Sequence, residues 1–217
     1  MEKTKAVYVL LTRTQTKVAS LVRRFGHVKY YNHCALALDK DLTQLYAFAR
    51  PEQHGLLLGK MVRETKDRYT NGDTMHIPAC VLEIPVTDEE YELVYNRVQE
   101  IENDKEYMYN FLSVITHPFK GGMSVYKSYS CVEFVAAMLK MIDRRLSKEA
   151  CRYLPDDLYL HYQNEIRFEG DLRDYMSTEQ RDDRYFKGLS WGLLFLNMIA
   201  LYKIIRRCLF SLFIDLF

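Results

Sequence analysis

"YKSYSCVEFVAAML", residues 126–139, decides how the rest of the chain is interpreted. A short polar stretch changes at Cys131 into an apolar one, with Val132, Val135 and Met138 at helical spacing. We therefore expect a helix with Cys131 in its first turn, where free backbone N–H groups and the helix dipole favour a thiolate. A thiolate at such a position is a candidate nucleophile. The alternative is a buried and inert thiol, which is common for free cysteines.

The composition is typical of a folded globular protein, and the length allows one domain with a sizeable core or one domain plus an appendage. The chain has 217 residues, of which 48% are hydrophobic and 27% charged, and its formal net charge is +1. No global field would attract nucleic acid, so we expect no nucleic-acid partner. The five cysteines are scattered, odd in number and without a CxxC pair. This pattern argues against a disulfide framework and a zinc site, and we expect a cytoplasmic protein without a metal or organic cofactor.

The order of the expected elements indicates an α+β fold. Runs rich in β-branched and aromatic residues predict strands at 5–13, 27–39, 45–50 and 76–86, with the second and third forming a hairpin. Apolar residues at helical spacing predict helices at 14–25, 87–103, 106–115 and 131–146. Thr87 is a good N-cap for the helix at 87–103. The pattern between 51 and 72 is weak. We expect a loop at 116–130, a capped turn at 154–162, and a strand followed by a turn at 165–175.

The C-terminal end of the chain is an apolar tail. Its apolar runs are interrupted by Lys203, Arg206, Arg207 and Asp215, and none reaches the roughly 20 consecutive apolar residues of a membrane-spanning helix. Cations at headgroup level favour a helix that lies on a membrane surface. The alternatives are a full span, or a helix docked on the domain or in a dimer interface. We divide the chain into a catalytic domain at 1–178, a charged linker at 179–187 and the tail at 188–217.

A cysteine nucleophile needs a base, and His33 is the best candidate among the six histidines. It lies inside an apolar stretch, between Asn32 and Cys34. A buried imidazole must find a partner, and histidine is the side chain best matched to proton transfer at neutral pH. The alternative is a core histidine whose hydrogen bonds are satisfied without any catalytic role.

Four segments, in this order, resemble the permuted papain-like cysteine hydrolases of the YiiX-like and YycO-like type, which are relatives of NlpC-type peptidases. They are "YYNHCALALDKDLTQLYAFAR" (30–50), "ACVLEIPVTDEEYELV" (79–94), "YMYNFL" (107–112) and "YSCVEFVAAML" (129–139). In the permuted group the histidine strand precedes the cysteine helix, as it does here. The resemblance covers roughly residues 5–175. It implies an antiparallel sheet packed against the helix that carries the cysteine.

The resemblance also implies an acyl-transfer site, with Cys131 as the nucleophile and His33 as the base, acting on a peptide, isopeptide or lipid acyl substrate. A third polar residue, on the strand after the histidine, would orient the imidazole. The segment 45–50 has no Asp, Glu, Asn or Gln, which leaves Tyr46 and the preceding Gln44 as candidates. Tyr109 matches the family's tyrosine near the oxyanion; a half-buried packing tyrosine is the alternative.

Two further interpretations stay open. The lecithin:retinol acyltransferase-like enzymes also place a histidine strand before a cysteine helix, and some carry a C-terminal hydrophobic anchor. Their "NCEHF" motif matches here only in part, because Val132 and Glu133 stand where it has an acid and a histidine. We expect Glu133 to face solvent or to cap the first helical turn, not to take part in catalysis. The other interpretation is a membrane-bound scaffold without activity, which the missing orienting residue favours.

Overall fold

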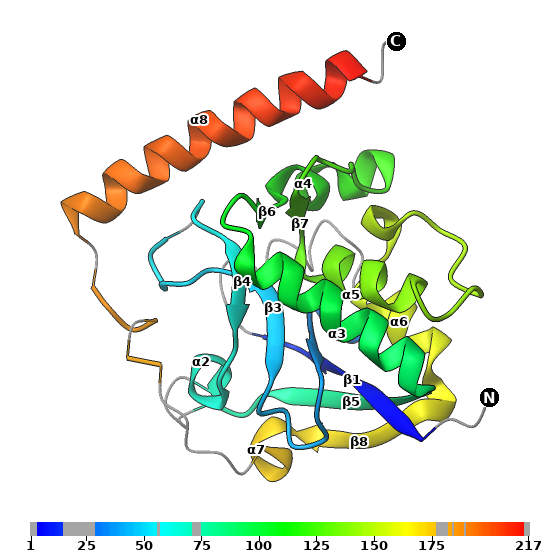
Figure 1. The fold of residues 1–217 in the computed structure, drawn as a ribbon. Helices are drawn as coiled ribbons and strands as arrows, with labels where there is room; N and C mark the ends of the chain where they lie inside the picture. Colours follow the sequence, from blue (N-terminus) through cyan, green and yellow to red (C-terminus); the bar gives the residue numbers. More distant parts are fainter. Residues whose placement is uncertain are drawn as a thin grey trace.

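A computed structural model describes the chain except for residues 1–3, 15–28, 56, 71–74, 177–181, 184, 189 and 215–217. The helix expected at 14–25 lies almost wholly outside the described residues. Within the described residues the protein is α+β, with a mostly antiparallel arrangement of strands and helices packed on both faces of the main sheet (Figure 1).

The main sheet in the described residues has six antiparallel strands in the order β4-β3-β2-β1-β5-β8. Their bounds are β1 (Lys5–Thr12), β2 (His33–Ala37), β3 (Leu45–Ala49), β4 (Lys60–Arg63), β5 (Pro78–Val86) and β8 (Ile166–Asp171). β1 pairs along its whole length with β5, and the register of β1 with β2 sets Thr12 opposite His33. His33 therefore begins β2 at an end of the strand, where a side chain can reach beyond the sheet.

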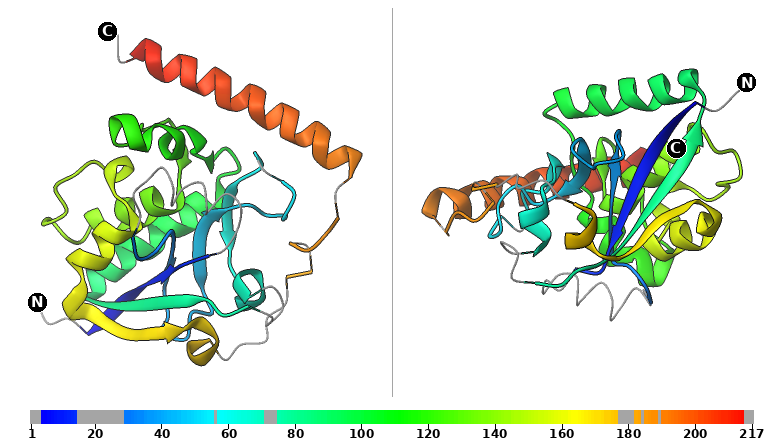
Figure 2. Two further views of the ribbon diagram at one scale, coloured as in Figure 1. Left: turned by 180° about the vertical axis from the view of Figure 1, so that it is seen from behind. Right: turned by 90° about the horizontal axis from the view of Figure 1, so that it is seen from below.

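Both faces of the sheet are buried, because successive side chains of a strand point to opposite faces. In β1, Val7, Val9 and Leu11 belong to the larger core, whereas Tyr8 and Leu10 belong to the smaller one. Helices α3 (Asp88–Asn103) and α5 (Cys131–Lys140) cover the larger core, and α7 (Leu172–Tyr175) packs on the smaller one. Figure 2 shows these layers from behind and from below.

Two expected helix starts are confirmed. Thr87 caps α3, its side chain accepting from Glu90 N at 3.2 Å while Glu90 Oε2 accepts from Thr87 N at 2.9 Å. Helix α5 begins at Cys131, as expected, but ends at Lys140, earlier than the expected 146. Its apolar stripe, including Phe134, enters the larger core against β2 and β3.

The segment 106–115 was expected to be one helix, and this expectation is wrong. It begins with the short strand β6 (Met108–Tyr109), which pairs in parallel with β7 (Ser128–Tyr129). Helix α4 (Phe111–Lys120) starts only after Asn110, whose side chain caps it by accepting from Ser113 N at 3.0 Å. α4 then runs into the expected loop and ends at Gly121, whose φ of 72° suits glycine.

Other boundaries also differ from the expectations. The strand expected at 27–39 is shorter than predicted and consists of β2 alone. The backbone N–H groups of residues 29–31 donate to the Asp156 carboxylate and not to a neighbouring strand. The expected turn at 154–162 is a short helix, α6 (Pro155–His161). The weakly patterned region 51–72 contains β4 and α2 (Lys66–Thr70). Short 3-10 helices occur at η1 (Ala150–Arg152) and η2 (Gln163–Glu165).

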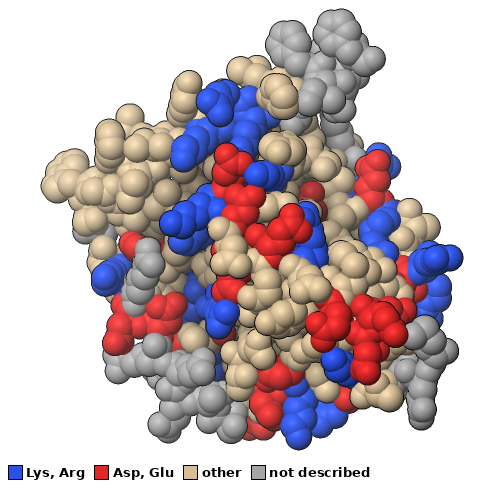
Figure 3. All heavy atoms as spheres, in the orientation of Figure 1, with Lys and Arg blue, Asp and Glu red and all other residues tan. Residues whose placement is uncertain are grey.

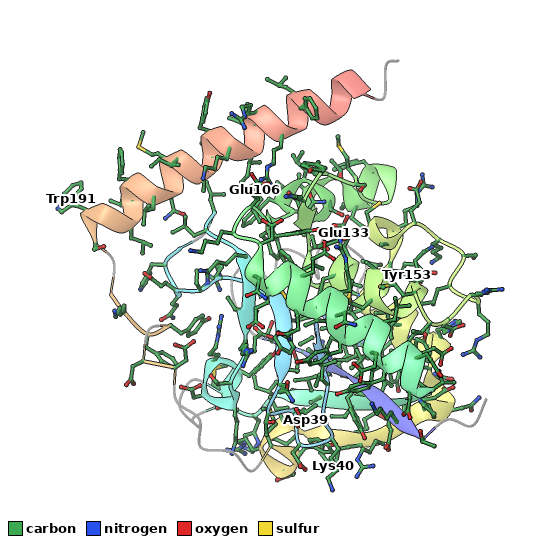
Figure 4. The ribbon with its side chains drawn as sticks, viewed as in Figure 1. Asp39, Lys40, Glu106, Glu133, Tyr153 and Trp191 are labelled. Atoms are coloured by element: carbon green, nitrogen blue, oxygen red, sulfur yellow. The ribbon has the colours of Figure 1, made fainter. Side chains whose placement is uncertain are left out.

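The tail forms one continuous helix, α8 (Trp191–Ile214), that runs across the top of the domain in Figure 1. Its contacts with the domain include hydrogen bonds: Asn197 Oδ1 accepts from Leu57 N at 2.8 Å, and the Arg207 guanidinium donates to the Glu106 carbonyl at 2.8 Å. Trp191 is 85% exposed and points away from the domain (Figure 4). Among the described residues, no helix combines the length and the apolar character needed to cross a membrane.

Candidate active site

The site is built around Cys131, the first residue of α5. Ser130 is the N-cap, and it forms a capping box with Glu133: Ser130 Oγ accepts from Glu133 N at 3.2 Å, and Glu133 Oε2 accepts from Ser130 N at 3.1 Å. The capping box fixes the first turn of the helix. The N–H of Cys131 has no partner within the helix at this position, and the helix dipole favours negative charge there.

His33 lies between Cys131 and a buried carboxylate, Glu64. His33 Nε2 is 2.9 Å from Glu64 Oε2, which leaves Nδ1 for the hydrogen bond to the Cys131 sulfur. Glu64 directly follows β4, and its N–H donates to the Leu45 carbonyl at 2.8 Å. The Tyr69 hydroxyl, from α2, also donates to Glu64 Oε2. The structure therefore assembles a cysteine, a histidine and a glutamate in one chain of hydrogen bonds.

The electrostatics of this chain favour charge separation. Burial alone would lower the pKa of His33, but the charges of Glu64 and Cys131 raise it well above its usual value. The Cys34 thiol and backbone N–H donate to the Cys131 sulfur, and together with the charge of His33 they hold the pKa of Cys131 well below its usual range in spite of burial. Burial would raise the pKa of Glu64, but the charge of His33, with a smaller effect of Arg68, lowers it.

Tyr109 closes the site from another side. Its pKa is raised well above the usual value, first by burial and then by the negative charge of Cys131, so its hydroxyl stays protonated and donates to the sulfur. Gly59 holds this tyrosine in place: Tyr109 N donates to the Gly59 carbonyl at 2.7 Å, and a Cβ on Gly59 would lie only 2.3 Å from the Tyr109 Cβ. A residue larger than glycine at position 59 would displace Tyr109.

The other two candidates for orienting His33 lie elsewhere. Tyr46 is fully buried in the larger core, and its hydroxyl accepts from Gln99 of α3 at 3.4 Å. Gln44 belongs to the turn that joins β2 to β3, where its N–H donates to Asp39 Oδ2 at 2.7 Å. Neither is among the described residues that line the space around His33. The geometry assigns the contact with His33 to Glu64 instead.

Sequence reasoning missed Glu64 because it searched only the strand after the histidine. The carboxylate comes one strand later, immediately after the four residues of β4. This strand is short and none of its residues is fully buried, so it shows no strong alternation of apolar and polar residues. The only signal in the sequence is a glutamate next to a short run, "KMVR", at 60–63.

Glu133 caps the first turn of α5, which is one of the two expected roles, but it does not face solvent. It is 2% exposed, and it points inward between α4 and α5 (Figure 4). Asn110 Nδ2 donates to its Oε2 at 2.9 Å, which joins the starts of the two helices. Burial raises the pKa of Glu133 to about 7.

Two cavities meet at Cys131. The first, of about 130 Å³, is the more polar of the two and has His33, Glu64 and Arg68 in its lining. The second, of about 290 Å³, lies between α4 and the segment that joins η1 to α6, and apolar side chains dominate its lining. Asn32, Tyr109 and Cys131 line both. Cys131 therefore lies where a more polar and an apolar space join.

No protein-family model matches the sequence, and the searches of curated proteins and of solved structures return no match either. Among the described residues, no group of three or more His, Cys, Asp or Glu side chains is placed to hold a metal ion.

Proposed function

We propose that the protein is a thiol hydrolase that forms an acyl-enzyme at Cys131, with His33 as the proton carrier and Glu64 as the residue that orients it. The observation that carries the proposal is the hydrogen-bonded chain from the Cys131 sulfur through His33 to Glu64. A nucleophile, a base and a group that orients the base are the three parts that acyl transfer needs. The substrate is an ester or an amide.

The reaction has two halves. The Cys131 thiolate attacks the carbonyl carbon and forms a C–S bond, and the oxyanion receives hydrogen bonds from the Cys131 N–H and the Tyr109 hydroxyl. The bond to the leaving group then breaks, and His33 transfers its proton to the departing oxygen or nitrogen. In the second half His33 takes a proton from water, the resulting hydroxide attacks the thioester carbon, and the acid leaves as the thiolate forms again.

The order of the elements supports a permuted papain-like fold. The histidine strand β2 precedes the cysteine helix α5, and α5 packs on β2 and β3 of an antiparallel sheet. The interpretation as an inactive scaffold depended on the absence of a residue that orients His33. The contact between Glu64 and His33 weakens that interpretation. A lipid acyltransferase of the lecithin:retinol acyltransferase-like type shares the chemistry as far as the acyl-enzyme and differs only in the acceptor.

The test is to trap the acyl-enzyme. The full chain is mixed with p-nitrophenyl acetate, quenched in acid after milliseconds to seconds, and weighed by mass spectrometry. We expect one acetyl group on Cys131 that disappears as acid is released. Cys80→Ala is the matched control, because this buried thiol lines neither cavity and burial raises its pKa to about 12. Acetylation that survives Cys131→Ala, or that is lost in Cys80→Ala, would contradict the proposal.

The tail supports a second element of the proposal, a membrane surface as partner. Leu193 and Ala200 of α8 face the domain, while large apolar side chains such as Trp191 and Phe195 face outward. Basic side chains gather over the middle of α8, and its first half presents an uncharged surface (Figure 3). The sequence places Lys203 and Arg206 in this region. An apolar face beside cations is suited to a bilayer with anionic headgroups.

Sedimentation with vesicles tests the membrane contact. The full chain is expected to pellet with vesicles that contain phosphatidylserine, more weakly with pure phosphatidylcholine vesicles, and less as the salt concentration rises. Trp191→Ser together with Phe195→Ser is expected to reduce binding about tenfold or more, because two exposed apolar side chains are lost. Leu93→Ser, at an exposed position on α3, is the control. Equal binding by the double variant and the control would contradict the membrane contact.

A further inference from the structure

The apolar cavity on the α4 side of Cys131 indicates which substrates the site takes. Its walls are formed by Val114 and Pro118 of α4 on one side and by Leu154 and Pro155 on the other. Cys131, whose sulfur would carry the acyl group, also lines this cavity. We propose that this cavity, called here the acyl groove, binds the hydrocarbon chain of a fatty acyl ester; the inference rests on the proposed acyl-enzyme at Cys131.

The two cavities divide the substrate at the bond that is broken. The carbonyl carbon must lie at the sulfur, where Asn32, Tyr109 and Cys131 line both spaces. The acyl half then extends into the acyl groove, and the leaving half extends into the polar cavity. In the polar cavity the His33 proton is available for the departing oxygen. A peptide substrate would put polar amide groups on both sides of the bond, and the mostly apolar lining of the acyl groove offers them few partners, which makes their burial costly.

The volume of the acyl groove sets the length of the chain. An apolar cavity of about 150 Å³ takes one benzene molecule of six carbons. The acyl groove, with about 290 Å³, is about twice that size, so it has room for roughly twelve carbons. Longer chains would leave through the mouth, where Ile115 is 61% exposed and Phe119 is 84% exposed.

The mouth of the acyl groove lies on α4, and α8 covers the first turn of this same helix. Phe111 and Leu112, in the first turn of α4, line a small space together with Ile204 and Arg207 of α8. The exposed apolar side chains of α4 and of α8 are therefore on neighbouring elements, and both would meet a bilayer from which an acyl chain can enter. His117 is one of several polar side chains in the lining of the groove: its Nε2 is buried without a partner among the described residues, and its ring is kept neutral because burial lowers its pKa.

The chain-length profile of p-nitrophenyl esters tests the inference. Acetate, hexanoate, decanoate and hexadecanoate are compared below their critical micelle concentrations, with kcat/KM as the readout. We expect kcat/KM to rise by up to about fourfold for each buried methylene, and to stop rising near ten to twelve carbons. Cys131-dependent cleavage with a flat profile would overturn the acyl groove and leave the thiol hydrolase intact.

Two variants locate the effect. Val114→Trp fills the acyl groove, and Ile115→Glu puts a charge at its exposed mouth, where it does not threaten folding; each is expected to lower the decanoate-to-acetate ratio of kcat/KM at least tenfold. Leu93→Trp and Leu93→Glu, on the exposed face of α3, are the matched controls and should leave the ratio unchanged. A ratio that does not move in either groove variant contradicts the inference.

Binding separates the two proposals if no ester is cleaved. Decanoate is titrated into the Cys131→Ala protein while displacement of a fluorescent fatty acid is followed. Saturable binding that is lost in Cys131→Ala/Ile115→Glu supports the acyl groove even though hydrolysis has failed. Absence of saturable binding overturns the acyl groove whatever the outcome of the trapping experiment.

Discussion

Glu64 and Glu133 are equally buried carboxylates near Cys131, with exposures of 6% and 2%, and their pKa values shift in opposite directions. Burial favours the neutral acid at both positions. At Glu64 the positive charges of His33 and Arg68 outweigh burial, so the pKa falls. At Glu133 the partners are the neutral N–H groups of Asn110 and Ser130, so burial prevails and the pKa rises to about 7.

The difference shows that the groups around His33 are ion-paired, whereas the groups around Glu133 hold the first turn of α5 in place. Ion-paired groups near a reactive atom can move protons, whereas hydrogen bonds between neutral groups hold two helix ends together. Glu64 therefore controls the state of the Cys131 sulfur through His33, and Glu133 controls where the sulfur lies. Substitutions in the two regions should have different signatures.

The largest effect is expected from a substitution of His33, which lies between Glu64 and Cys131. His33→Gln removes the positive charge and keeps a donor for Glu64, so the pKa of Cys131 should rise, while the Cys34 donors still act on the sulfur. A neighbouring opposite charge shifts a pKa by about 1–3 units, so alkylation of Cys131 by iodoacetamide at pH 5.5 should slow by up to about 1,000-fold. The rates are measured by mass spectrometry from pH 5 to 9.

Cys80, a buried cysteine with a pKa raised to about 12, serves as the internal control in the same experiment. Its alkylation should be slow and unaffected by His33→Gln. The thiolate–imidazolium pair is refuted if Cys131 of the unsubstituted protein reacts at pH 5.5 no faster than it does in His33→Gln.

Glu64→Gln should have the next largest effect. The imidazolium loses its buried counter-charge, the pKa of His33 falls, and kcat for p-nitrophenyl acetate should drop about 100-fold. The alkaline limb of the pH–rate profile should move to lower pH, because His33 loses its proton earlier. Glu52→Gln, a glutamate outside both cavities, is the control.

Stability gives a second measure of the same pair. The pKa of His33 is raised, so its contribution is fully present below about 6.5 and is lost as the pH rises through the raised value. The pKa of Glu64 is lowered, so its contribution is present above about 4.5 and is lost as the pH falls. The loss of Tm in Glu64→Gln should therefore be largest near pH 5 to 6.5. An equal loss at pH 3 and pH 6 would contradict the ion pair.

A smaller effect is expected at Gly59. Gly59→Ala would place a Cβ within 2.3 Å of the Tyr109 Cβ, so Tyr109 must shift away from the sulfur. If Tyr109 donates to the oxyanion, kcat of Gly59→Ala should fall about tenfold, and kcat of Tyr109→Phe should fall by a similar factor. Gly188→Ala is the matched control, because no atom lies within 4 Å of the added Cβ. A normal kcat in both Gly59→Ala and Tyr109→Phe would assign Tyr109 to packing.

How much of this site could be predicted from sequence depends on how local each signal is. Cys131 and the start of its helix can be predicted from consecutive residues, and His33 can be recognised as a histidine within an apolar run. The structure brings Cys131 and His33 together. Glu64 could not be found, because its role arises from the pairing of β3 with β4, a contact between segments that show no strong pattern. The start of α4 was missed for a similar reason: β6 pairs with β7, which lies on the far side of α4 in the chain.

The smallest effect on rate, and a distinct effect on stability, is expected from Glu133→Gln. The glutamine keeps an acceptor for Ser130 N and Asn110 Nδ2 but cannot ionise. The folded protein binds the Glu133 proton more tightly than the unfolded chain does, so this stabilisation is full below about 4.5 and is lost as the pH rises through about 7. Relative to the glutamine variant, the unsubstituted protein should therefore lose about 3 kcal/mol of unfolding free energy between pH 4 and pH 8. Urea unfolding at the two pH values measures the change, and kcat should differ less than threefold at pH 6. A pH-independent difference in stability would show that folding does not shift the pKa of Glu133, and it would contradict the contrast between the two carboxylates.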